Sequence, residues 1–149
     1  MTRSAPILAR GLIVAAAFVL SGCEEEAPTP VANPTAEKAV LSLELADFTY
    51  SFKDGRHTYG HKRRFIESAG LGVVLHKGKV CVHNGEECAE AIVKYRIDPS
   101  ATQEQKDHYI ATKQVTDTVT IDYWGKDDKG SDVQLHKVIR VDNKAATVE

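Results

Sequence analysis

The first candidate functional site consists of Cys81, His83 and Cys88, because side chains of these types at this spacing could bind a metal ion. Thiolate and imidazole groups both bind zinc, so these side chains are candidate metal ligands. Their spacing differs from that of a zinc finger, and the sequence offers no evident fourth ligand. A disulfide between Cys81 and Cys88 is the favoured alternative if the protein is exported.

A cluster of carboxylates at residues 126–132 (KDDKGSD) is the second candidate metal site. Calcium binds clustered carboxylates such as those of Asp127, Asp128 and Asp132. An EF-hand loop that began at Asp127 or Asp128 would need glutamate at position 138 or 139, where the chain has Val138 and Ile139. The cluster is therefore predicted to be the solvated loop of a hairpin.

Motifs of the common enzyme classes are missing. The sequence contains no G-x-S-x-G, H-E-x-x-H, P-loop or C-x-x-C motif. A Ser-His-Asp triad whose members lie far apart in the sequence and meet only in the folded protein would leave no such motif, so an enzyme stays the alternative. We therefore expect a non-enzymatic protein without a cofactor, and a small enzyme or metal-dependent binding domain is the alternative.

The densest positive charge lies at residues 56–64 (RHTYGHKRR), in a chain with a formal net charge of −2. Arg56, Lys62, Arg63 and Arg64 carry this charge, and Tyr59 lies among them. A local basic patch attracts phosphate groups or an acidic protein surface. These residues are predicted to contact a partner, and the acidic balance of the chain gives no indication of nucleic acid binding.

The single tryptophan, Trp124, belongs to the segment IDYWG beside a predicted loop. Exposed aromatic side chains often anchor protein–protein contacts. Trp124 is therefore added to the predicted partner-binding residues, and a position in the core or at a sheet edge is the alternative.

The N-terminus has the composition of a secretory signal peptide. Arg3 and Arg10 supply positive charge, and an apolar run follows from Gly11 to Leu20. The run is shorter than the roughly 20 apolar residues that span a bilayer. A charged start, a short apolar segment and small residues at its end are typical of a signal peptide over residues 1–22.

The sequence Leu-Ser-Gly-Cys at residues 20–23 resembles the lipobox of bacterial lipoproteins. The resemblance covers only this N-terminal part. It implies cleavage after Gly22 and lipidation of Cys23 with three acyl chains, as diacylglyceride and palmitate, which anchor a protein far more firmly than one chain. Glu24 follows the cysteine, where an aspartate commonly retains such proteins in the inner membrane. The outer membrane is therefore favoured, with the folded part in the periplasm.

Residues 23–38 are predicted to be a flexible tether, because they are rich in proline and glutamate and poor in large apolar side chains. Fully extended, such a segment reaches at most about 50 Å. Residues 39–149 then suit one small domain. Export leaves Cys81 and Cys88 as an even pair in an oxidising compartment, which predicts a disulfide.

Alternation of apolar and polar residues predicts strands in the first part of the domain. Residues 40–52 alternate, with a change of phase near Ala46 and Asp47 that a β-bulge or a break into two strands would produce. Residues 56–68 fit either a short helix or a strand, and the strand is preferred.

Two apolar runs at 71–75 and 79–83 are separated by HKGK, which is predicted to be a turn. Asn84-Gly85 is the strongest hairpin signal in the chain. As a two-residue loop it would place Cys81 opposite Cys88 in a hydrogen-bonded pair, with the Cα atoms about 5.5 Å apart.

The rest of the chain predicts three more strands, at 89–97, 115–124 and 133–141. Residues 100–108 are polar and are predicted to be a loop with at most one helical turn. Residues 143–149 are predicted to be frayed.

Six or seven short strands predict a mainly β domain, a small antiparallel β-sandwich or open barrel with room for one short helix. With the lipobox, this layout is that of small envelope lipoproteins. We expect an outer-membrane-anchored periplasmic lipoprotein that binds another envelope protein. Proteins of this layout include secretion and conjugation assembly factors, exclusion or immunity proteins, and hydrolase inhibitors.

Overall fold

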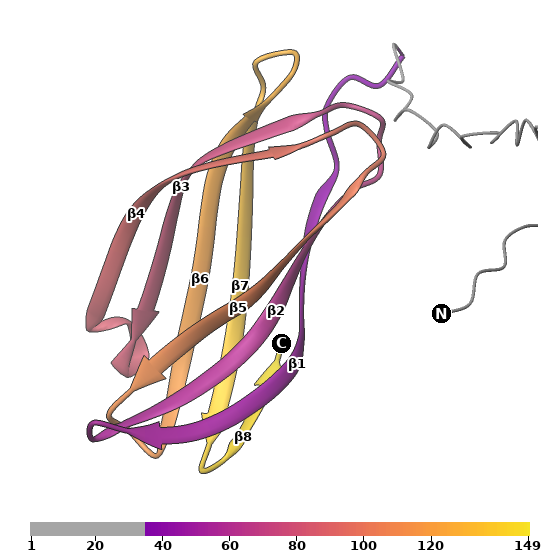
Figure 1. The fold of residues 1–149 in the computed structure, drawn as a ribbon. Coiled ribbons are helices and arrows are strands. Elements are labelled where there is room, and N and C mark those ends of the chain that lie inside the picture. The colour runs from indigo at the N-terminus through magenta and orange to yellow at the C-terminus, as the bar shows by residue number, and fades with distance from the viewer. Residues whose placement is uncertain (1–34) are drawn as a thin grey trace, which may run out of the picture.

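The protein is a two-layer antiparallel β-sandwich, seen in a computed structural model that describes residues 35–149 (Figure 1). One sheet has the order β1-β2-β5, and the other has the order β4-β3-β6-β7-β8. The predicted mainly β fold is confirmed, and the described residues contain one 3₁₀ turn and no α-helix. The elements are β1 (Leu41–Lys53), β2 (Arg56–Glu67), β3 (Val73–Val82), η1 (His83–Gly85), β4 (Glu87–Ile97), β5 (Thr102–Thr112), β6 (Thr116–Asp127), β7 (Asp132–Asp142) and β8 (Ala145–Val148).

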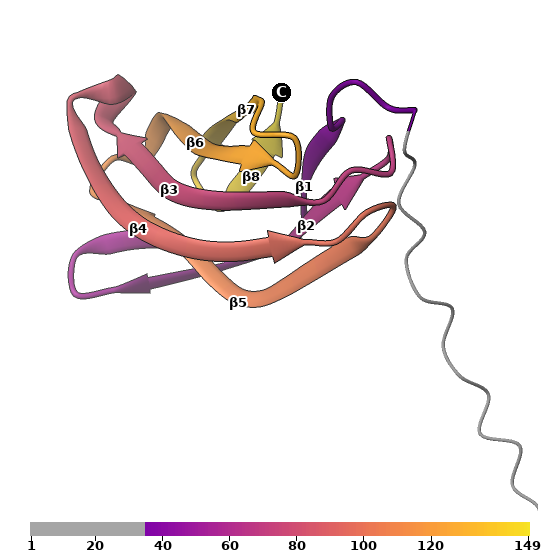
Figure 2. The same cartoon turned by 90° about the horizontal axis from the view of Figure 1, so that it is seen from above.

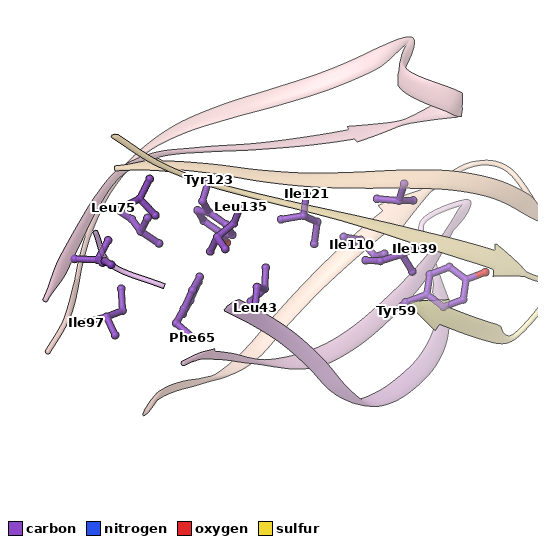
Figure 3. Packing of buried hydrophobic residues seen from close by; sticks show 14 of the residues in the cluster. Leu43, Tyr59, Phe65, Leu75, Ile97, Ile110, Ile121, Tyr123, Leu135 and Ile139 are labelled. Carbon is purple, nitrogen blue, oxygen red and sulfur yellow. The ribbon is translucent and has the colours of Figure 1, made fainter. Parts of the chain in front are cut away.

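The core lies between the two sheets, where alternate side chains of each strand meet (Figure 3). The strand period of two sends every second residue inward, so apolar residues two apart share the core face. Phe65 is fully buried, and its ring packs edge-on to that of Tyr123 at 5.2 Å between centroids. Other buried members of the core are Leu43, Tyr59, Val73, Leu75, Ile97, Ile110, Val119, Ile121, Ile139 and Val141.

The predicted change of phase in β1 is a β-bulge. The register with β2 shifts between Ala46 and Thr49, and Asp47 has a positive φ of 54°. The extra residue lets the residues before and after it turn their apolar side chains to the same face. Residues 56–67 form the strand β2, which confirms the preferred alternative.

The predicted turn at HKGK is wrong, because residues 73–82 form one continuous strand, β3. The register with both neighbouring strands shifts between Leu75 and Lys77, so a bulge lies where the turn was expected. Gly78 packs closely, since a Cβ there would lie 3.0 Å from Cε1 of Tyr123. This glycine therefore marks a close approach within a strand.

Two strands occupy segments for which none was predicted. Residues 102–112 form β5, the edge of the three-stranded sheet, although glutamine stands at inward positions where apolar residues are usual. Residues 145–148 form β8, which pairs with β7 after a tight turn in which Asn143 has a φ of 54°. The left-handed conformation that asparagine tolerates makes this turn possible.

The hairpin between β3 and β4 carries the predicted disulfide, Cys81–Cys88. The loop is a 3₁₀ turn with positive φ at His83, Asn84 and Gly85, and not a two-residue turn. The Asp117 carboxylate holds it by accepting the backbone N–H groups of His83 and Asn84 at 2.9 and 3.0 Å. The Cα atoms of the two cysteines are 4.0 Å apart, which fits the closer, non-hydrogen-bonded type of cross-strand pair. The predicted hydrogen-bonded pair with a longer Cα distance is therefore wrong.

The described chain enters the fold at one end of the sandwich. The backbone N–H of Ala39 donates to Oδ2 of Asp127 at 3.1 Å, and Ala36 packs against the core, so the first contacts lie within the predicted tether. The β2–β3, β4–β5 and β6–β7 loops share this end, whereas the disulfide hairpin lies at the opposite end (Figure 1). The two ends are called the entry end and the far end below.

A buried carboxylate, that of Glu67, joins three segments at the entry end. Its oxygens accept backbone N–H groups from Val40 at 3.2 Å and from Ala69, Gly70 and Ser100 at 2.8 Å each. Burial alone raises the pKa of Glu67, but these donors together hold it below its usual value. Glu67 is thus an ionised tie between the start of β1 and the β2–β3 and β4–β5 loops.

Candidate functional site

The predicted basic patch at residues 56–64 does not form one surface. Because β2 alternates, Tyr59 and Arg63 point into the sandwich and are 0% and 7% exposed, while Arg56 and Arg64 are exposed. Lys62 pairs with Asp47 at 2.6 Å on the outer face. The expectation that all five residues face a partner together is therefore corrected.

Trp124 lies on the outer face of the other sheet, away from the outward residues of β2. It is half-buried, and Nζ of Lys77 stands 5.2 Å from the centre of its ring. This contact is a cation–π interaction across β3 and β6. Trp124 and the outer residues of β2 therefore belong to opposite sides of the molecule.

The two candidate metal sites are occupied by other interactions. The thiols of Cys81 and Cys88 are joined, and Nδ1 of His83 lies 3.0 Å from Glu87. Asp127 accepts backbone N–H groups in its own loop, as a hairpin loop requires, and Asp128 pairs with Arg96. Within residues 35–149, no three His, Cys, Asp or Glu side chains gather as a metal site would need.

The side of the sandwich bordered by β4 and β5 is open. These consecutive strands cross from one sheet to the other through the loop at the entry end, and they diverge toward the far end (Figure 2). Two adjoining hollows of about 220 and 420 Å³ lie between them and share Val80 and Ala89. Together they form a groove, here called the β4–β5 groove.

Small side chains explain why the groove is not filled. Gly78, Ala89 and Ala91 line the smaller hollow from the five-stranded sheet, where larger apolar residues would close a sandwich. His108 lines it from β5. The larger hollow extends to the disulfide hairpin and is lined by Arg56, Val80, Val82, Glu87, Cys88, Ala89, Tyr109, Ile110 and Ala111.

Arg63 stands at the floor of the smaller hollow, beside Tyr123. Its Nη1 donates to the Tyr123 hydroxyl, and its Nε donates to Nε2 of His61 at 3.2 Å. In the part of the chain that the structure describes, Arg63 has no carboxylate partner within salt-bridge distance. A buried cation without a counter-charge is unfavourable, which sets this residue apart from the paired surface cations.

The histidines around Arg63 add no positive charge. Burial, with a smaller contribution from the nearby Arg63, lowers the pKa of His61 to about 4. Burial and Arg63 likewise lower the pKa of His108. A neutral His61 with its hydrogen on Nδ1 satisfies both of its contacts, since Nδ1 lies 3.3 Å from the Tyr59 carbonyl oxygen and Nε2 accepts from Arg63. The guanidinium is therefore the cation of the groove floor at neutral pH.

Comparisons with known proteins extend the description of the fold. No protein-family model matches the chain, and no curated protein matches it. A solved structure of a Bordetella pertussis protein called ApaA is similar over 80% of this chain and 95% of its own, at 13% identity and a TM-score of 0.52. A structural genomics target, SoR45, is similar over 70% and 85%, at 12% identity and a TM-score of 0.50. At these identities the likeness shows the fold alone.

Sequence reasoning named Arg63 but misplaced it, and it missed the groove. The alternation of residues 59, 61, 63 and 65 was a usable signal, because it puts Arg63 on the same face as Phe65. Strand alternation puts Gly78, Ala89 and Ala91 on the inner face of their sheet. The empty space beside them depends on how the two sheets pack, which the sequence does not reveal.

Proposed function

We propose that this protein is a lipid-anchored periplasmic binding protein of the outer membrane, non-enzymatic, whose partner docks on the open β4–β5 side. The observation that carries the proposal is the groove itself. Its walls are strands at the edges of both sheets, so a partner meets unpaired backbone groups together with apolar side chains.

The position of the groove agrees with an anchor at Cys23, a residue that lies outside those the structure describes. The chain enters at one end of the sandwich, and the larger hollow reaches the disulfide hairpin at the far end. A flexible tether joined at the entry end leaves the far end free to face away from the bilayer. No helix among residues 35–149 is long and apolar enough to span a membrane.

An exposed aromatic residue that lines the groove marks where contact with a partner is expected. Tyr109 lines the larger hollow and is 66% exposed, an unusual value for a large aromatic side chain. Val40 is 57% exposed and lies at the entry end, where its backbone N–H donates to Glu67, and it lines neither hollow. These two positions form a matched pair for a crosslinking experiment.

Photocrosslinking in the native cells tests the proposal. A photoreactive phenylalanine analogue at Tyr109 should yield one dominant protein adduct in the outer-membrane fraction, and the same analogue at Val40 should yield little of it. The variant Cys23→Ala should leave the membrane fraction and lose the adduct. An envelope complex in the adduct indicates an assembly role, and a hydrolase indicates an inhibitor.

Equal adducts from Tyr109 and Val40, or none from Tyr109, would reject docking on this side. A Cys23→Ala protein that still sediments with the membrane would reject the anchor.

A further inference from the structure

We propose that the floor of the β4–β5 groove is a binding site for a carboxylate, held by Arg63 and carried by a ligand with a short apolar body. The inference deepens the proposed function, on which it rests for the accessibility of the groove. It assigns to Arg63 a role that burial, hydrogen bonding and charge indicate together.

The counter-charge that Arg63 needs is absent at the position where the sheet would supply it. Gln105 of β5 is the residue directly opposite Arg63 in the β2–β5 register. A glutamate there would form a cross-strand ion pair. Glu104, the neighbouring glutamate, points outward instead, opposite Arg64. The strand thus places the Glu104 carboxylate on the outer face and the neutral Gln105 side chain on the inner face that it shares with Arg63.

Hydrogen-bonding capacity remains at the groove floor. Of the guanidinium donors, Nε and Nη1 are bonded to His61 and Tyr123, and Nη2 has no hydrogen bond within the described chain. The Tyr123 hydroxyl accepts from Arg63 and keeps its own hydrogen for another acceptor. Arginine and tyrosine donors side by side suit the two oxygens of one carboxylate.

The charge and walls of the site favour a carboxylate over a phosphate dianion. His61 and His108 are neutral, so one positive charge at the floor balances one negative charge. At the rim, Glu90 pairs with Lys77 at 3.0 Å and lies opposite Lys79 in the register. Side chains of Ala89, Ala91, Val93 and Tyr95 make the wall apolar, and about 220 Å³ holds a short aliphatic group.

Binding of butyrate to the full-length chain in detergent micelles is the first measurement, followed through the Nε–Hε signal of Arg63 in NMR titrations. Butan-1-ol has the same carbon chain without the charge. N-acetyl-Ala-Val and its C-terminal amide represent the carboxylate of a protein chain. We expect the carboxylates to bind at least about tenfold more tightly than the alcohol and the amide, since a charged hydrogen bond is involved.

Three variants separate the site from general charge effects. Gln105→Glu places an internal carboxylate opposite Arg63 and should weaken butyrate binding at least about tenfold while the thermal midpoint is kept or raised. Thr102→Glu adds the same charge to the exposed face of β5 and should change binding less than about twofold. Arg63→Met should abolish binding, and it provides the test if the Gln105→Glu protein fails to fold.

Equal binding of butyrate and butan-1-ol would overturn the inference, as would Gln105→Glu and Arg63→Met proteins that bind butyrate normally. Displacement of butyrate by equimolar inorganic phosphate would also overturn it. Binding of butyrate alone supports a small free carboxylate, and binding of the free peptide but not its amide supports the C-terminus of a partner. Adducts at Tyr109 without carboxylate binding would leave the proposed function standing and reject only this site.

Discussion

Replacing Phe65 with alanine should destabilise the protein by about 3–5 kcal/mol, the cost of removing a fully buried aromatic ring from a core. Phe65 is 0% exposed and contacts the rings of Tyr95 and Tyr123 at 5.9 and 5.2 Å between centroids, so its loss empties space between the sheets. Domains of this size are stable by about 5–15 kcal/mol, so the change takes a large part of the total.

Urea unfolding of the Phe65→Ala protein, followed by far-ultraviolet circular dichroism, measures this loss. Phe52→Ala is the matched control, because Phe52 is 61% exposed and its truncation should cost less than about 1 kcal/mol. Similar losses in the two variants would contradict the packing described for β2 and β6.

Glu67→Gln should cost about 2–3 kcal/mol at pH 7, because an ionised carboxylate that accepts four backbone N–H groups is replaced by a neutral amide with only one acceptor oxygen. The expected effect depends on pH. Since the pKa of Glu67 is lowered in the folded protein, its stabilising contribution is present above the unfolded value of about 4.3 and is lost as the pH falls through the folded pKa.

The difference in unfolding free energy between the wild type and Glu67→Gln should therefore be constant from pH 7 to about 5 and should shrink below about pH 4. Glu44→Gln is the control, because Glu44 forms an exposed pair with Arg64 at 3.1 Å and should change stability by less than about 1 kcal/mol. A difference that grows on acidification would contradict the ionised tie at the entry end.

Local sequence patterns predicted the strands whose inward residues are apolar. The alternation of residues 40–52 indicated β1, with a bulge or a break near Ala46 and Asp47, and the segments at 115–124 and 133–141 indicated the β6–β7 hairpin. The cysteine pair was predicted from the hairpin signal and the even count. In each case the information lies within a few residues, where strand period and turn chemistry act directly.

The features that sequence reasoning missed depend on contacts between distant segments. β5 carries Gln103 and Gln105 at inward positions, and their side-chain oxygens are buried without hydrogen-bond partners, which no periodicity rule anticipates. β8 is short and gains its stability from pairing with β7. β3 runs through HKGK while pairing with both β4 and β6, and the ring of Tyr123 lies close to Gly78.

The predicted basic patch shows how charge and periodicity must be combined. Charge alone grouped Arg56, Tyr59, Lys62, Arg63 and Arg64, whereas the strand period divides them between two faces. Because of this alternation, Arg63 points toward the core and lies at the floor of the proposed carboxylate site. Lys62 and Arg64 point outward and pair with carboxylates of β1.

The central claim, that a partner docks in the β4–β5 groove, is tested most directly by filling the groove. Ala91 lines the smaller hollow, and Ser51 is exposed on β1, at the opposite edge of the three-stranded sheet. In cells that carry the photoreactive residue at Tyr109, Ala91→Trp should reduce the adduct at least about tenfold, while Ser51→Trp should leave it unchanged. An undiminished adduct in the Ala91→Trp protein, with its fold verified by circular dichroism, would contradict the claim.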